Sequence, residues 1–209
     1  AIENATLMDE VQKVNINLRS AYDATIEGWA RSIDLRNGDS EQHAKRVAEL
    51  TIELAQSVGV QGEGLLALRR GALLHDIGKL SVPDAILLKN GPLTEAEWQI
   101  MKTHPEAAKR LLTSIDFLQP VVEIPYYHHE HWDGSGYPEG LAGSDIPLSA
   151  RVFAIVDCWD SLRSDRPWRK AWTDGSAWDY IEKNSGVLFD PHVVEKFRQL
   201  IGHGFSAYY

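Results

Sequence analysis

The chain has 209 residues, a formal net charge of −9 and a calculated isoelectric point near 5.3. This length suits one domain of ordinary size with a short appendage, and 44% hydrophobic residues suit a globular core. The acidic balance argues against a general binder of nucleic-acid polymers, which would carry a basic face. An anionic substrate stays compatible, because a metal site can reverse the local electrostatic field.

Cysteine content and hydropathy bear on the compartment. Cys158 is the single cysteine, so no intrachain disulfide can form, and a reducing cytoplasm is the simplest localisation. We find no run of about 18 apolar residues that could span a membrane, and no signal-peptide pattern at the start. Because the first residue is Ala1 and not Met, we expect a domain taken from a longer protein.

Apolar residues recur every three or four positions along the N-terminal segment, which predicts one long helix with a single apolar stripe. Two interpretations stay open for its first three turns. The stripe packs on the core of the domain, or it forms a dimeric coiled coil that leads in from an upstream domain. Beyond Tyr22 we expect packing on the domain. The stripe comprises Leu7, Val11, Val14, Leu18, Tyr22, Ile26, Trp29 and Ile33.

Further helices follow in the first half of the chain. Ser40 is a plausible cap for a second helix, which Gly59 ends. A third helix, rich in Leu and Ala, is predicted over about 62–77 and stops at Gly78. On this prediction, His75 and Asp76 lie in the last turn of that helix.

The second half is also predicted to be helical. Thr94 and Glu97 form a capping box that opens a helix reaching about residue 112, with Trp98 and Leu111 on its buried side. A helix from about Pro120 leads into a loop over 130–147. Ser149 is expected to cap the next helix, and Asp190 to cap a last helix that has Pro191 in its first turn. No convincing strand pairs occur, so the predicted fold class is all-α.

Histidine and aspartate side chains gather at predicted helix positions. A single histidine of this kind is more often a satisfied core residue than a ligand, but the set as a whole predicts a metal site. An ionised carboxylate in a run as apolar as IVDCWDSL costs on the order of several kcal/mol unless a cation meets it. The candidate ligands are His43, His75, Asp76, His104, His128, His129 and Asp157.

The doublet in LLHDIGKL resembles the HD-domain phosphohydrolases, and HHEHWDGSGYP adds the elements of the HD-GYP subfamily, the bacterial cyclic di-GMP phosphodiesterases. The doublet alone is a weak signal. The ordered series DSEQHAKRV, HDIGK, HPEAAKRLL, HHEHWDGSGYP, VDCWDSLRSDRPW and GVLFDP is very specific, and it covers the chain from about Thr25 to Phe197. The resemblance implies an all-α HD-domain helical bundle. It divides the chain into a linker or signalling helix over 1–24 and an HD-GYP catalytic domain over 25–209.

The resemblance implies that all seven candidates bind metal, with Asp76 as the catalytic carboxylate that bridges two ions about 3.5–4 Å apart. A bridging water or hydroxide is the expected nucleophile. Imidazole-rich ligation argues against Mg²⁺ and Ca²⁺. The resemblance implies iron or manganese, while ligand type leaves zinc, cobalt and nickel open. Some family members hold a third ion through a glutamate four residues before the first histidine. Here that position is Asp39, which either binds a third ion or merely caps a helix.

Substrate contacts are implied at two kinds of residue. Lys79, Arg166 and Arg169 stand where the family has cations for the substrate phosphate, and Lys79 is also expected to assist catalysis. The alternative for each is a solvated surface cation. In the glycine-rich loop, Gly136 lets the backbone turn sharply beside the site. Tyr137 and Pro138 then offer flat or rigid surface near a guanine base or a partner, and all three are expected to bind substrate. Glu130, His131 and Asp133 are expected to orient ligand imidazoles or to stabilise the loop.

The leading hypothesis is hydrolysis of cyclic di-GMP to linear pGpG, and to GMP after a second cut. The first alternative is a phosphodiesterase for hybrid cyclic GMP-AMP. The second is a module that senses cyclic di-GMP without cleaving it, which is disfavoured because all seven ligands are present. The expected partners are a cyclic dinucleotide, an upstream sensor or receiver domain and, through the N-terminal helix, a second copy of the chain.

Overall fold

The computed structural model of the protein describes residues 2–38, 42–165 and 169–202, with side chains described from residue 6 onward. Within these ranges the secondary structure is helical and contains no strand, which confirms the all-α fold class. None of the helices in this part of the chain is long and apolar enough to cross a membrane.

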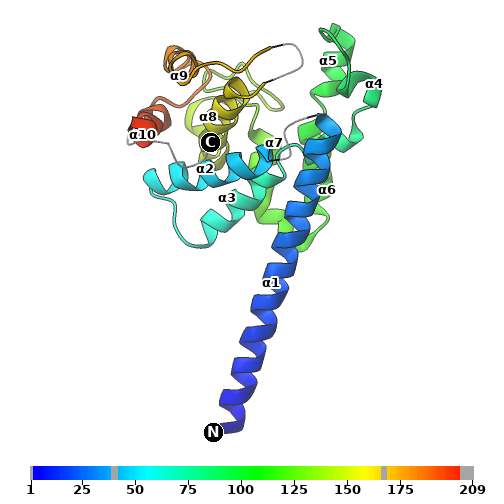
Figure 1. Ribbon diagram of the computed structural model, residues 1–209, viewed down its shortest axis with the longest axis vertical. Coiled ribbons are helices and arrows are strands. Elements are labelled where there is room, and N and C mark those ends of the chain that lie inside the picture. Colours follow the sequence, from blue (N-terminus) through cyan, green and yellow to red (C-terminus); the bar gives the residue numbers. More distant parts are fainter. Residues whose placement is uncertain (1, 39–41, 166–168, 203–209) are drawn as a thin grey trace.

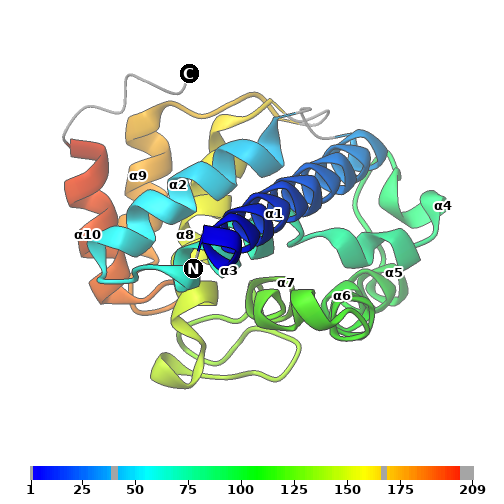
Figure 2. The same cartoon turned by 90° about the horizontal axis from the view of Figure 1, so that it is seen from below.

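The helix α1 (Ile2–Asn37) is continuous over 36 residues, and its N-terminal half extends away from the other helices (Figures 1 and 2). Leu7, Val11, Val14 and Leu18 are between 46% and 63% exposed, so the interpretation that these turns pack on the core is wrong. Farther along the stripe Ile26 and Ile33 are buried, as expected, whereas Trp29 between them is 39% exposed. The predicted domain boundary after residue 24 falls inside α1 and stays a prediction.

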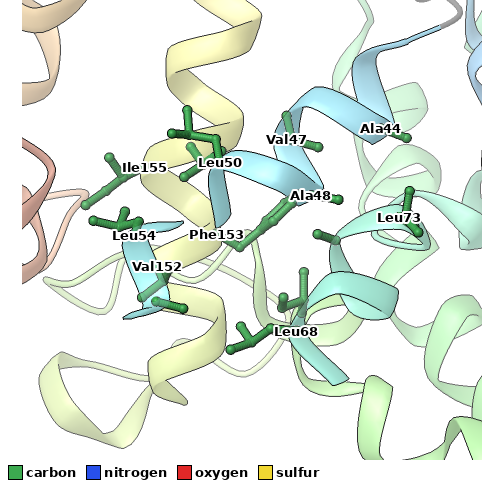
Figure 3. Packing of buried hydrophobic residues seen from close by; sticks show 14 of the residues in the cluster. Ala44, Val47, Ala48, Leu50, Leu54, Leu68, Leu73, Val152, Phe153 and Ile155 are labelled. Carbon is green, nitrogen blue, oxygen red and sulfur yellow. The ribbon is translucent and has the colours of Figure 1, made fainter. Parts of the chain in front are cut away.

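The core lies where α2 (His43–Ser57), α3 (Glu63–Leu73) and α8 (Leu148–Arg163) meet, as Figure 3 shows. Val47 and Leu54 on α2 contribute side chains that are fully buried, and Phe153 on α8 is fully buried too. Burying one side chain of this size contributes roughly 1.5–3 kcal/mol. This packing fixes the N-terminal end of α2 beside the middle of α8, where candidate ligands lie.

The third helix ends earlier than predicted. It stops at Leu73, and a turn leads into the 3₁₀ helix η1 (Ile77–Ser81), so His75 and Asp76 lie between two helices. Apolar periodicity could not reveal this break, because the residues of the turn are as buried as those of the helix. Gly78 does not end the helix. Its backbone passes so close to the next layer that an added Cβ would lie 1.8 Å from the backbone oxygen of His104.

The helix predicted to start at residue 95 is two helices, α5 (Glu95–Met101) and α6 (His104–Thr113). Pro105 explains the break, because proline lacks an N–H and is tolerated only in the first turn of a helix. The capping box of Thr94 and Glu97 is confirmed. Trp98 and Leu111, predicted to be buried, are 44% and 42% exposed.

Shorter elements complete the fold. The segment predicted as a helix from Pro120 is divided between η2 (Asp116–Val121) and α7 (Glu123–Tyr127). Because α8 begins directly after Pro147, Ser149 does not cap it. Asp190 does cap the last helix, because its Oδ1 accepts the His192 backbone N–H at 2.8 Å. The remaining elements are α4 (Asp84–Leu87), η3 (Gly143–Asp145), α9 (Asp174–Lys183) and α10 (Pro191–Gly202).

Candidate metal centre

The structure brings the seven predicted ligands together from five parts of the chain. They lie at the first residues of α2 and α6, in the turn after α3, at the end of α7 and in the middle of α8. Neighbouring imidazole rings contact one another, with centroid distances of 5.5 Å for His43–His75, 5.6 Å for His75–His128 and 5.4 Å for His104–His128.

The ligand atoms form two groups of three. One group is His43, His75 and Asp157, and the other is His104, His128 and His129. Within each group the ligand atoms all lie within 4.8 Å of one another. Each group therefore has the size of a site for one metal ion.

Asp76 lies between the two groups. Its Oδ2 is 3.3 Å from Nε2 of His75 in the first group, and its Oδ1 is 3.7 Å from Nε2 of His104 in the second. A carboxylate placed in this way could offer one oxygen to each of two ions, as bridging carboxylates do in two-metal hydrolytic sites.

The imidazole rings are held with Nε2 toward the site. The Nδ1 atom of His75 lies 2.8 Å from the Ala72 carbonyl oxygen, and Nδ1 of His43 lies 2.7 Å from Asp160 Oδ2. Both acceptors call for a proton on Nδ1, so in the neutral form of each ring the lone pair lies on Nε2. His104 and His128 are held in the same way by the carbonyl oxygens of Met101 and Ile124, at 2.9 Å and 3.1 Å.

Two of these Nε2 atoms are buried without a hydrogen-bond partner among the described residues. They belong to His104 and His128. Buried polar atoms are normally hydrogen-bonded, so an orphaned imidazole nitrogen points to a missing partner. Because the orphans face the cluster and the donor set is rich in imidazole, the residues fit divalent transition-metal ions.

Burial sets the charge of the second group. It lowers the pKa of His104, and it lowers the pKa values of His128 and His129 well below the usual value, helped by the neighbouring imidazoles. These three rings are therefore neutral at pH 7, which is the form that binds metal. Burial also opposes charge on His75, but Asp76 raises the pKa of His75 to about 9.

Lys79 lies on η1, three residues after Asp76. Its Nζ is 2.6 Å from Asp76 Oδ2. Burial alone would raise the pKa of the Asp76 carboxyl, but Lys79 and the imidazoles of His75 and His104 lower it well below the usual value. Asp76 is consequently ionised, with a cation already at the edge of the site.

The predicted substrate-binding arginines and the third-metal ligand have different outcomes. Arg169 donates from Nη2 to the Ser161 carbonyl oxygen at 2.7 Å and from Nη1 to that of Leu162 at 2.8 Å. Its guanidinium therefore caps the C-terminal end of α8, and its role toward a substrate stays a prediction. Arg166 and Asp39 lie outside the described residues.

The glycine-rich loop borders the second group. The Tyr137 ring stacks on His129, with centroids 4.7 Å apart and an angle of 22° between the planes. Gly136 fits where no side chain could, because an added Cβ would lie 2.3 Å from the His131 backbone nitrogen. Pro138 continues this loop and is partly exposed. The positions of these three residues agree with the predicted binding loop, while their contact with a substrate stays a prediction.

Glu130 holds this loop in place. Its buried carboxylate accepts the backbone N–H groups of Glu139 at 2.8 Å, Gly140 at 3.1 Å and Leu141 at 3.0 Å. His131 and Asp133 also make contacts inside the loop, both with Ser135. Of the two roles considered for these residues, loop stabilisation is therefore the one that their contacts support.

Sequence reasoning missed two residues next to the site. Asp160 contacts His43, and Arg36 in the last turn of α1 donates to the backbone oxygens of Lys79 at 2.6 Å and Val82 at 2.8 Å. The signal for Asp160 was present, since a second acid follows Asp157 by one helical turn inside the same apolar run. Nothing in the sequence pointed to Arg36.

Comparison with known proteins identifies the family. A family model described as an HD domain matches residues 29–193. This chain belongs to the HD-domain family. Its motifs and relatives place it in the HD-GYP subfamily.

Three curated relatives illustrate the similarity. The chain is 40% identical over 173 residues to the cyclic di-GMP phosphodiesterase response regulator RpfG of Xanthomonas campestris, which covers 82% of this chain and 46% of RpfG. It is 40% identical over 169 residues to a cyclic di-GMP phosphodiesterase of Thermotoga maritima, covering 80% and 46% of the two chains. It is 35% identical over 195 residues to the 3′3′-cGAMP-specific phosphodiesterase 2 of Vibrio cholerae, covering 92% and 36%. The chain thus spans less than half the length of these relatives.

Solved structures share the fold at low sequence identity. A cyclic GMP-AMP-specific phosphodiesterase of V. cholerae, V-cGAP3, superposes with a TM-score of 0.69 and 19% identity, covering 86% of this chain and 48% of that one. The HD domain of the phosphodiesterase PgpH of L. monocytogenes, in complex with cyclic-di-AMP, gives a TM-score of 0.54 and 20% identity, covering 87% and 85%. These likenesses confirm the HD-domain helical bundle.

Proposed function

We propose that this domain hydrolyses the phosphodiester bonds of cyclic di-GMP and releases linear pGpG, with GMP as the product of a second cut. The observation that carries the proposal is the position of Asp76, whose two oxygens face two separate groups of ligand atoms. Cyclic di-GMP is favoured as the substrate because the relatives from X. campestris and T. maritima are named for it.

The seven ligands would hold two divalent ions, iron or manganese by resemblance, with a third if Asp39 contributes. When bound, such ions would supply an acidified water and positive charge at the phosphate. Lys79 would stabilise the charge that builds on the phosphoryl oxygens, since its ammonium lies at the edge of the site. Arg166 is a further candidate for stabilising this charge. Arg169 is another, provided that it leaves its position at the C-terminal end of α8.

The loop that ends in Tyr137 and Pro138 would receive a nucleobase. The Tyr137 ring is packed on His129, so a base that stacks against it would lie next to the second group of ligands. Aromatic stacking tolerates any base, so this contact alone does not choose between guanine and adenine. For that reason a phosphodiesterase for hybrid cyclic GMP-AMP is the second candidate, supported by the V. cholerae relative named for that activity.

The proposal is tested by measuring metal content per chain together with product analysis under anaerobic conditions. Cyclic di-GMP and hybrid cyclic GMP-AMP are supplied separately, and pGpG and GMP are quantified over time. We expect turnover of cyclic di-GMP by protein that holds about two ions. Full loading with iron or manganese and no cleavage of either dinucleotide would sink the enzymatic proposal and leave the sensing module.

Variants make this test specific to the site. Both His75→Ala and Asp76→Ala should abolish turnover and remove most of the bound metal, because one residue belongs to a ligand group and the other lies between the groups. Asp179→Asn, at an exposed position on α9, is the matched control and should leave both quantities unchanged. Activity retained in either site variant would place the chemistry elsewhere.

We further propose that the exposed half of α1 joins an upstream sensor or receiver domain to this one and pairs with a second copy in the cytoplasm. The exposed apolar residues of this half are spaced alternately by four and three positions, which is the heptad repeat of a two-stranded coiled coil. They are Leu7, Val11, Val14 and Leu18. Sedimentation of Val14→Lys against Gln12→Lys tests this pairing. A dimer lost only with Val14→Lys supports it, and a monomer in the unmodified protein opposes it.

A further inference from the structure

Asp160 is a buried carboxylate that the proposed mechanism does not use. It lies on α8, one helical turn after Asp157, and is 1% exposed. Its Oδ2 is 2.7 Å from Nδ1 of His43, whose Nε2 in turn lies 3.5 Å from Asp157 Oδ1. His43 is thus in contact with one aspartate at each ring nitrogen, and only Asp157 belongs to the first group of ligands.

The acceptor for Nδ1 of His43 differs in kind from the acceptors of the other imidazoles. His75, His104 and His128 each give the Nδ1 proton to a backbone carbonyl three or four residues earlier in the chain. A residue so placed can use the turn that precedes it. His43 is the first residue of α2, and its acceptor is a side chain on α8, 117 positions away.

Arg46 fixes Asp160 in turn. It donates from Nε to Asp160 Oδ1 at 2.7 Å and from Nη2 to Oδ2 at 2.8 Å. This two-pronged contact holds the carboxylate plane more rigidly than one hydrogen bond could. Arg46 and His43 are three residues apart on α2, so both project to the same side of that helix, toward α8.

We propose that Asp160 is a positioning residue, which fixes the tautomer and the orientation of His43 so that Nε2 binds the ion shared with His75 and Asp157. A carboxylate acceptor also makes an imidazole a stronger donor to metal than a carbonyl acceptor does. The inference rests on the proposed function only in requiring that the two groups bind metal. It predicts that loss of Asp160 weakens the binding of one of the two ions and leaves the binding of the other unchanged.

The first test measures metal binding without any nucleotide. Asp160→Asn keeps the size of the side chain and removes its charge. We expect manganese to bind the first site about 10–100-fold more weakly, the range found when such a carboxylate partner is lost. After dialysis against a weak chelator, the variant should keep close to one ion per chain where the unmodified protein keeps two.

A matched control separates positioning from general stability. Asp190 is also buried, at 4% exposed, and its Oδ2 accepts a hydrogen bond from Arg151 Nη1 at 2.6 Å. Its contacts, however, join α8 to the start of α10 and do not involve a candidate ligand. Asp190→Asn should therefore keep both ions while its melting temperature falls. If Asp160→Asn holds both ions as tightly as the unmodified protein, or if both variants lose metal equally, the inference is overturned.

The second test reads the tautomer of His43 directly. Long-range ¹H–¹⁵N NMR spectra of metal-free protein should show His43 protonated at Nδ1, and Asp160→Asn should give a mixture of tautomers. If Asp160→Asn does not fold, Asp160→Ser is measured in its place. Unchanged tautomers overturn the inference. Neither test uses a cyclic dinucleotide, so failure to cleave one would count against the proposed function and not against this role of Asp160.

Discussion

Arg36 Nη1 donates to the backbone oxygen of Lys79 at 2.6 Å, and this bond ties the last turn of α1 to the segment that follows the histidine–aspartate doublet. The same guanidinium reaches the Val82 carbonyl oxygen and Asp84 Oδ1, both at 2.8 Å. Asn37, the last residue of α1, has its side-chain nitrogen 3.5 Å from Asp76 Oδ2. The helix that extends away from the domain at one end thus contacts the candidate site at the other.

Arg36→Ala should lower turnover by about 10–100-fold, because Lys79 and Asp76 lose the bond that sets the position of their segment. The two carbonyls also lose their donor, which should cost about 1–3 kcal/mol of stability. Metal content should stay near two ions per chain, since none of the seven ligands is removed. Arg19→Ala is the control, because Arg19 contacts exposed Glu63 at 3.4 Å and should matter little. Equal turnover in both variants would contradict this role.

Gly78→Ala should prevent the site from forming. The added methyl group would lie 1.8 Å from the His104 backbone oxygen and 2.8 Å from the Ala108 nitrogen, and neither backbone group can move as a side-chain end could. We expect η1 to separate from α6, with loss of metal binding and a large fall in melting temperature. Gly28→Ala, in the interior of α1 with no atom within 4 Å, should instead stabilise the protein by about 0.5–1 kcal/mol. A normal melting temperature for Gly78→Ala would contradict the packing.

The sequence alone predicted the helical class and the seven residues that the structure gathers at the candidate site, for two different reasons. Apolar spacing marks helices such as α1 and α2 because a buried stripe must recur with the helical period. The seven candidate ligands came from histidines and aspartates at predicted helix positions and from motifs that occur in the family's order. Neither requires knowledge of distances. What periodicity could not give was the break at Leu73, since buried turns and buried helices have similar composition. The break at Lys102 lies at exposed residues, and its signal in the sequence was Pro105.

Contacts between distant segments were the other limit. Asp160 follows Asp157 by one turn, so its presence near the site could have been inferred, but its bond to His43 spans 117 positions. Arg36 meets Lys79 across 43 positions, and its charge alone does not distinguish it from a solvated cation. Such pairs depend on how the helices pack, which no local pattern in one sequence specifies.

The stability of the metal-free protein should be greatest near pH 7. His104, His128 and His129 have lowered pKa values in the folded state, so below about pH 6.5 the unfolded chain binds more protons and the free energy of unfolding falls. His75 acts in the opposite sense. Its pKa is raised to about 9, so its contribution is complete below pH 6.5 and is lost as the pH rises toward 9.

Urea titrations of EDTA-treated protein between pH 5 and pH 9.5 measure this dependence. His128→Asn should flatten the acid side of the curve, because it removes a ring that must stay neutral in the folded state. The exposed-site variant Asp179→Asn should leave the curve unchanged. Stability that rises steadily through pH 9 would contradict the assignment of a proton to His75.

Glu130→Gln should loosen the loop that carries Tyr137. The carboxylate accepts three backbone N–H groups, and a glutamine amide can accept with only one of its two ends. At least one of these part-buried N–H groups would lose its acceptor, at a cost of about 1–3 kcal/mol in unfolding free energy. We expect a lower melting temperature and faster protease cleavage within residues 130–147. Because Tyr137 stacks on His129 from this loop, KM for cyclic di-GMP should rise more than kcat falls.

Glu106→Gln, at an exposed position in the first turn of α6, is the control and should change none of these quantities. If the loop of Glu130→Gln resists protease as well as the control does, the three hydrogen bonds do not hold it.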